Sequence, residues 1–276
     1  MYKYFKLTKN LYWLLGVGGM LIIALLFFFL RSPACIRTFT VGALAEFGIF
    51  AGAMVAWMYG SDYAVEAVAI RKMRGVLDIL VEECDPERFL GYTGKMRNVE
   101  NKEVYTTYMA LNHARGLLYA GRMQESYTII RGIQTFTKGR KGRLNNLFYL
   151  ELLAETQLGL HAYEEADKSL ALFKEMLGKT KLAADKRSRM ELEYEQLQIA
   201  LDLRKGLHEG AAEKLQAIFN KAGHELHRVT AKYHLGKAYM HFGQTREARE
   251  AFQYVIDHGN KLHIVTEAKD TLAKLA

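Results

Sequence analysis

Histidine spacing decides whether this chain could hold a metal ion. A helix that binds zinc through two histidines places them about four residues apart, so that both rings face the metal. His224 and His227 are only three residues apart. His227, His234 and His241 recur every seven residues, which aligns them on one helix stripe, but no cysteine or pair of carboxylates nearby completes a coordination sphere. The sequence therefore predicts no metal site and no cofactor.

The residue patterns of common catalytic sites are also missing. Gly16, Gly18 and Gly19 lie inside an apolar run, whereas a phosphate-binding glycine loop follows a strand. Nucleophile-elbow and kinase signatures are absent. The acidic pair Glu164 and Glu165 lies at a predicted helix start, where it complements the helix dipole. We therefore expect no enzymatic activity.

Glu46 is the one charged side chain within two long apolar runs, residues 11–30 and 39–59. A charge inside a membrane is costly unless it faces protein, water or a partner. A protonated or interface-facing Glu46 fits a structural role. The alternative is an accessory subunit of a membrane enzyme or transporter, in which Glu46 takes part in proton or substrate handling.

The two apolar runs are each long enough to cross a bilayer. A cleaved signal peptide has a shorter apolar region, so we predict two transmembrane helices that form a hairpin over residues 1–60. Small residues recur every four positions in the second run, at Gly48, Gly52 and Ala56, and permit close helix approach. Packing against the first run is the favoured interpretation, and homo-oligomerisation is the alternative.

Basic residues indicate the orientation of this hairpin. Lys3, Lys6 and Lys9 precede the first run, and further basic residues follow the second, while the connecting loop holds only Arg31 and Arg37. Because cytoplasmic flanks carry the excess of lysine and arginine, we predict a multi-pass protein of the cell membrane with a cytoplasmic C-terminal region.

Residues 61–100 are predicted to be linking helices between this anchor and the rest of the chain. An amphipathic pattern runs through residues 61–83. Asp85 and Pro86 then restart a helix, with the aspartate as its N-cap and the proline in its first turn.

Residues 230–256 contain two apolar stripes at helical spacing, separated by a turn at Gly243. Leu235 and Gly236 are followed by Tyr239 on the first helix, and Ala248 is followed by Phe252 on the second. This pattern resembles a tetratricopeptide repeat. The resemblance implies an all-α solenoid of antiparallel helix pairs that binds other proteins.

Weaker units of the same kind precede this one, within a repeat domain predicted over residues 101–276. Small residues that match Ala248 occur at Ser126, Ala166 and Ala211, with separations of 40, 45 and 37 residues. The family repeat is about 34 residues, so longer helices or inserted loops are expected. Residues 262–275 read as a closing helix, and the helix from Asp85 is expected to shield the other end.

In the resembling family, partners bind a concave groove lined by the first helices of successive repeats. Aromatic residues flanked by charges suit an extended peptide or a partner helix, although core packing also explains the aromatic members. The groove residues implied here are Tyr108, Arg115, Tyr119, Phe148, Glu151, Glu155, Tyr233, Lys237 and His241.

A basic run between the first two predicted repeats is the densest charge feature of the chain. In a domain tethered beside a membrane, such a run could contact anionic lipid head groups. A solvated glycine-rich loop is the alternative. Nucleic acid is disfavoured, because half of the net charge of +8 lies in the first 60 residues and the remainder carries mixed signs. The run comprises Lys138, Arg140, Lys141 and Arg143.

Overall fold

The computed structural model describes residues 16–24, 48–57, 60, 73–97, 103–133 and 139–275. Helices and the turns between them make up these residues, and no strand occurs among them. The predicted all-α class is confirmed. The chain divides into two compact units, residues 1–75 and 76–276.

The first unit contains helical stretches at 16–24 and 48–57, which belong to the two apolar runs. They contact each other where Gly19 meets Trp57, because a Cβ added at Gly19 would lie 2.3 Å from the Trp57 ring. Among the described residues, Gly48 and Gly52 have no such neighbour within 4 Å. Among the described residues, no helix is long and apolar enough to cross a membrane. The rest of both runs, including Glu46, lies outside the described residues.

The second unit begins with a helix that is built into its core. In the stretch 73–81, Val76, Ile79 and Leu80 are buried. Helix α3 (Pro86–Arg97) follows, and the backbone N–H of Arg88 donates to Asp85 Oδ1 at 3.0 Å. The predicted aspartate N-cap is therefore confirmed.

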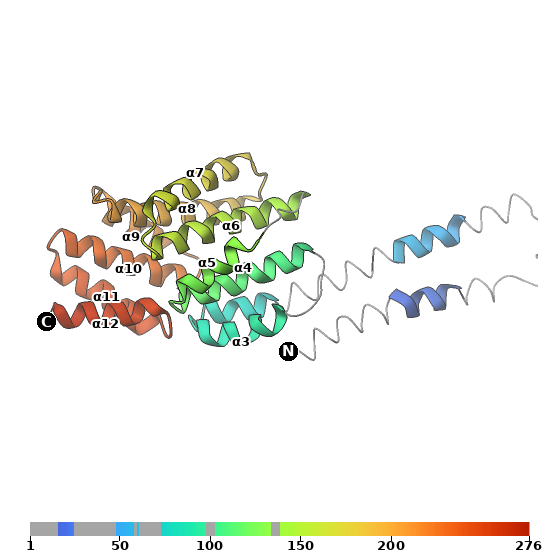
Figure 1. The fold of residues 1–276 in the computed structure, drawn as a ribbon, viewed down its shortest axis with the longest axis horizontal. Coiled ribbons are helices and arrows are strands. Elements are labelled where there is room, and N and C mark those ends of the chain that lie inside the picture. Colours follow the sequence, from blue (N-terminus) through green and yellow to red (C-terminus); the bar gives the residue numbers. More distant parts are fainter. Residues whose placement is uncertain are drawn as a thin grey trace, which may run out of the picture. The chain divides into compact units, whose positions relative to one another are not determined.

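The remainder of the second unit consists of consecutive antiparallel helix pairs (Figure 1). Two first helices, α6 and α8, have 21 residues each, which accounts for the long separations between the matching small residues. The pairs are α4 (Glu103–Tyr119) with α5 (Met123–Arg131), α6 (Gly139–Gly159) with α7 (Tyr163–Lys179), α8 (Ala184–Arg204) with α9 (Ala211–Lys221), and α10 (Glu225–His241) with α11 (Thr245–His258), followed by α12 (His263–Lys274).

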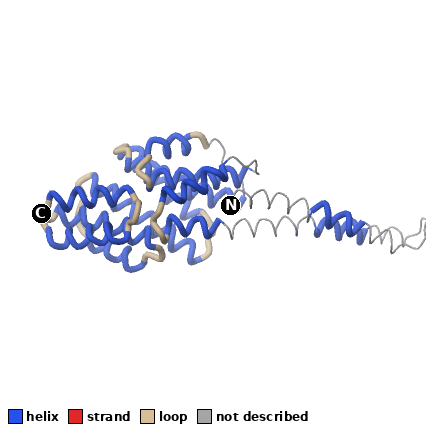
Figure 2. Tube along the Cα trace, turned by 90° about the horizontal axis from the view of Figure 1, so that it is seen from below, coloured by secondary structure: helices blue, strands red, loops and turns tan. Residues whose placement is uncertain are grey.

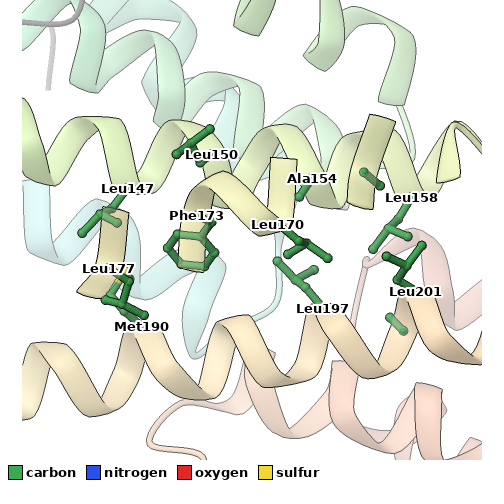
Figure 3. Close-up of a cluster of buried hydrophobic side chains, with 12 residues drawn as sticks. Leu147, Leu150, Ala154, Leu158, Leu170, Phe173, Leu177, Met190, Leu197 and Leu201 are labelled. Carbon is green, nitrogen blue, oxygen red and sulfur yellow. The ribbon is translucent and has the colours of Figure 1, made fainter. Parts of the chain in front are cut away.

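Small residues allow the paired helices to pack closely. Ala166 and Ala248 are fully buried in the second helices α7 and α11. A Cβ added at Gly236 on α10 would lie 2.8 Å from the Phe252 ring of α11, so this glycine makes room for the aromatic side chain. Between α6, α7 and α8, leucines interdigitate around Phe173 (Figure 3).

The two ends of the second unit contact each other, which the sequence pattern did not predict. Lys261 Nζ lies 2.7 Å from Asp85 Oδ2, and its backbone N–H donates to Cys84 O at 3.2 Å. His224 Nδ1 lies 2.5 Å from Glu82 Oε1. Helix α3 packs against α4, and α12 packs against α11, as expected for helices that close the array, and the additional contacts bring these two ends together (Figure 1). The same helices are seen from below in Figure 2. Each repeat pattern is local, whereas curvature is the sum of small rotations over all repeats.

Candidate functional site: the face lined by the first helices

Side-chain contacts between successive first helices recur at an almost constant sequence separation. Arg115 contacts Glu151, and Tyr119 contacts Glu155, each 36 residues later. Separations of 34 residues join Glu193 to His227, Gln196 to Thr230, and Tyr233 to Glu267. Helices α4, α6, α8, α10 and α12 thus share one surface, which we call the first-helix face.

One group of side chains on this face forms an ionic cluster, defined as Arg115, Tyr119, Glu151, Glu155, Glu193 and His227. Arg115 Nη2 donates to Glu151 Oε1 at 2.7 Å, and the Tyr119 hydroxyl donates to Glu155 Oε2 at 3.2 Å. His227 Nε2 contacts Glu193 Oε1. The cluster therefore connects four helices, namely α4, α6, α8 and α10.

Burial controls the protonation of the cluster. It raises the pKa of Glu151 to about 8, despite the opposing guanidinium of Arg115, and the pKa of Glu155 to about 7. Burial also acts to raise the pKa of Glu193, but His227 outweighs it and the net shift is downward. The pKa of His227 is raised, because Glu193 outweighs the opposing effect of burial. Near neutral pH, Glu193 is therefore ionised beside His227, whereas Glu151 and Glu155 each carry a proton for a substantial part of the time.

Glu151 combines burial with an unsatisfied oxygen. The residue is only 3% exposed, and its Oε2 atom has no hydrogen-bond partner among the described residues. A buried carboxylate oxygen without a donor is costly, so such an atom is uncommon in a packed structure. It marks the place in the cluster where a hydrogen-bond donor is missing.

A second group, the C-terminal polar cluster, comprises Tyr233, His234, Lys237, His263 and Glu267. The Tyr233 hydroxyl donates to Glu267, and Lys237 Nζ lies 3.6 Å from Glu267 Oε2. Lys237 Nζ also lies 4.1 Å from the centre of the Tyr233 ring.

Burial lowers the pKa values of the basic groups in this second cluster. The pKa of Lys237 falls to about 8 through burial and the nearby Arg204. The pKa of His234 falls to about 3 through burial and the charge of Lys237. His234 is therefore neutral near pH 7, and Lys237 deprotonates far more readily than an exposed lysine.

The structure brings together most of the groove residues predicted from the sequence. Arg115, Tyr119, Glu151 and Glu155 form most of the ionic cluster, and Tyr233 and Lys237 lie in the C-terminal polar cluster. Their side chains largely contact one another, and Glu151, Tyr119 and Tyr233 are all less than 10% exposed. The structure therefore does not contain a groove in which all nine residues face solvent.

The three remaining groove residues differ from one another. Tyr108 and Phe148 are half-buried, and the Arg115 guanidinium carbon lies 5.5 Å from the centre of the Phe148 ring. His241 is exposed at the end of α10 and stacks on His208, with ring centres 3.3 Å apart. Tyr108 and Phe148 are thus partly accessible to a partner, and His241 is exposed.

Sequence reasoning missed Glu193, His227 and Glu267 as members of the first-helix face. A usable signal existed, because His227 follows Glu193 by 34 residues and Glu267 follows Tyr233 by the same number. The third unit was hard to align, because Leu197, Ile199 and Leu201 fit the family's first helix only with a one-residue slip, so Glu193 had no assigned position.

The basic run differs from the expected loop. Residues 139–143 begin helix α6, and Arg143 is exposed there. Lys138 and the side chains of Arg140 and Lys141 lie outside the described residues. The glycines of this run, Gly139 and Gly142, had indicated a loop, but both lie within the first turns of α6.

One open depression of about 540 Å³ lies between the turn after α4 and helix α12. Gly121, Met123, His263, Glu267 and Lys269 are among its lining residues. In the described part of the chain, no three His, Cys, Asp or Glu side chains are close enough to hold a metal ion.

Comparison with known proteins adds no relative. No protein-family model matches the chain, and no curated protein and no solved structure matches it either.

Proposed function

We propose that this protein is a non-enzymatic scaffold of the tetratricopeptide-repeat type, anchored in the cell membrane, that binds a protein or peptide partner through the first-helix face. The observation that carries this proposal is the constant 34- to 36-residue spacing of the contacts between first helices. This spacing agrees with a family repeat of about 34 residues.

Partner binding is supported by the chemistry of the first-helix face. It combines aromatic and charged side chains, and aromatic and arginine anchors contribute most to protein interfaces. Tyr108 and Phe148 are partly exposed on it, and His241 is exposed. An extended peptide or an amphipathic helix is the expected partner.

Membrane anchoring is supported by the first unit. The apolar runs of the sequence are long enough to span, and the described parts of both expose large apolar side chains. Leu21 and Ile22 are 58% and 59% exposed, and Ile49 is 74% exposed. The distribution of basic residues favours a cytoplasmic second unit, and labelling of Cys35 from outside intact cells tests this orientation. Protection of Cys35 would contradict the orientation.

Photocrosslinking in native membranes tests partner binding. A photoreactive residue at Tyr108 or His241 should capture a partner, whereas the same residue at Arg246 should not. Arg246 is a matched control because it lies on the second helix α11, where its side chain is 87% exposed. Equal capture from all three positions would contradict binding through the first-helix face.

A second candidate function rests on Glu46, the only charge within the apolar runs. In an accessory subunit of a membrane enzyme or transporter, Glu46 would handle a proton or a substrate. Replacement Glu46→Gln keeps the size and removes the titration. A scaffold should assemble and support growth unchanged, whereas an accessory subunit should lose activity.

A further inference from the structure

The ionic cluster contains more acidic than basic groups. Glu151, Glu155 and Glu193 supply three carboxyls, against the guanidinium of Arg115 and the imidazole of His227. Both bases are already engaged, Arg115 by Glu151 and His227 by Glu193. Glu155 receives only the neutral hydroxyl of Tyr119. Within the six residues of the cluster itself, the carboxyls therefore outnumber the bases by one.

The unsatisfied oxygen of Glu151 independently indicates a missing donor. Its Oε2 is buried without a hydrogen-bond partner, although Oε1 of the same carboxylate is held by Arg115. An ammonium or a guanidinium supplies several N–H donors together with a positive charge, and bonds of this kind to carboxylates are the strong ones. A cation would therefore supply both a hydrogen-bond donor for Glu151 Oε2 and a positive charge beside the three carboxyls.

The cluster is not sealed from solvent. The side chains of Arg115, Glu193 and His227 are 19%, 17% and 13% exposed, and Glu155 is half-buried. The other charged group that acts on the cluster is Arg189 of α8, which is exposed at its edge. A flexible side chain could approach through this partly open side.

We propose that the ionic cluster binds the basic end of a lysine or arginine side chain from the protein partner. This inference rests on the proposed function and specifies the partner as a basic segment. In the free protein a proton on the carboxyls compensates the excess negative charge, and the incoming cation displaces that proton. Binding should therefore strengthen as the pH rises from about 6 to about 8, through the pKa of Glu155 at about 7.

The test uses the full-length protein in detergent micelles with ¹³C-labelled glutamate carboxyls, observed by NMR during titration with n-butylammonium and with methylguanidinium. These probes carry the ends of lysine and arginine side chains. The carboxyl signals of Glu151, Glu155 and Glu193 should shift in a saturable manner. Glu155→Gln should weaken binding on the order of tenfold. The matched control Glu195→Gln, which alters an exposed carboxylate on α8, should leave the binding unchanged.

Several results would overturn the proposal. Shifts no larger than that of Glu195, or shifts that never saturate, would show that the cluster holds no cation. Saturable binding that is equal at both pH values, in the unmodified protein, would exclude proton displacement and would not depend on any variant folding. Spermidine serves as a third probe, and affinity more than about 100-fold above that of n-butylammonium would assign the site to a free polyamine.

The proposed function and this inference can fail separately. If crosslinking at Tyr108 captures a partner while neither probe binds, the scaffold function stands and the inference is wrong. If the probes bind but no partner is captured, partner binding is wrong, and with it the assignment of the cation to a partner side chain.

Discussion

The ionic cluster and the C-terminal polar cluster occupy the same face and use the same spacing, yet their charge balance is opposite. Three carboxyls face two bases in the first, whereas Lys237, His234 and the nearby Arg204 face Glu267 alone in the second. Burial raises the pKa values of carboxyls in one cluster and lowers those of basic groups in the other. Burial disfavours every charge in both clusters, and its effect remains uncompensated on the groups whose sign is in excess.

The opposite balance also predicts opposite responses to pH. Protons added below pH 8 neutralise excess carboxylates in the ionic cluster, whereas in the C-terminal polar cluster they add to an existing excess of positive charge. The following predictions test this difference, beginning with the largest expected effect.

Arg115→Met should give the largest loss of stability. It leaves the buried Glu151 without its partner, and removal of one member of a buried pair costs about 3–5 kcal/mol. The matched change Lys237→Met should cause no comparable loss, because Glu267 keeps the Tyr233 hydroxyl and is half-exposed. Urea unfolding of the full-length protein near pH 8 measures both. Equal losses would show that the two clusters are energetically alike.

Glu155→Gln should make the protein more stable at high pH. The pKa of Glu155 is raised from 4.5 to about 7 on folding, so the folded state binds more protons than the unfolded state between these values. Stability therefore falls as the pH rises through this range, and glutamine removes that loss. We expect a gain on the order of 1–3 kcal/mol at pH 8 relative to the parent protein, and a smaller gain at pH 5. A gain that does not depend on pH would contradict the raised pKa.

Lys237→Met should show the reverse trend. The pKa of Lys237 is lowered from 10.5 to about 8, so between these values the folded state binds fewer protons than the unfolded state. Parent stability therefore rises with pH over this range, and the substitution removes the rise. At pH 7, where the lysine is charged at a cost, the variant should gain on the order of 1 kcal/mol over the parent. Thermal unfolding at pH 7 and pH 10 measures whether that advantage disappears.

Lys261→Met should have the smallest effect. This lysine joins the two ends of the second unit through Asp85, but its side chain is 57% exposed and water screens the ion pair. A loss below about 1 kcal/mol is expected, together with increased hydrogen exchange at the amide of Lys261, which donates to Cys84 O. A loss as large as that of Arg115→Met would show that contact between the ends, and not the ionic cluster, dominates stability.

Several elements could be predicted from sequence because their signals are local. Asp85 caps α3 through Arg88, as its position before Pro86 indicated. The unit at residues 230–256 folds as the helix pair α10 and α11, as the resemblance implied. The predicted closing helix is α12, which buries Ile264, Val265 and Ala268.

The candidate site was predicted only in part. Arg115, Tyr119, Glu151 and Glu155 were assigned to the first-helix face from repeat alignment alone. The sequence did not predict that these four side chains are buried against one another, because a repeat pattern gives the direction of a side chain and not its distance from the next helix. Glu193 was missed, because the apolar residues of the third unit fit the repeat pattern only with a one-residue slip.

The sequence by itself determined the helices, their pairing and the side chains that point toward the first-helix face, because helical periodicity and turn residues act within a few residues of each other. Only the tertiary structure decided that Lys261 meets Asp85 and that three carboxyls are confined with Arg115 and His227. Those contacts depend on the curvature summed over all the helix pairs and on the exclusion of water between them. Neither quantity is encoded in any single repeat.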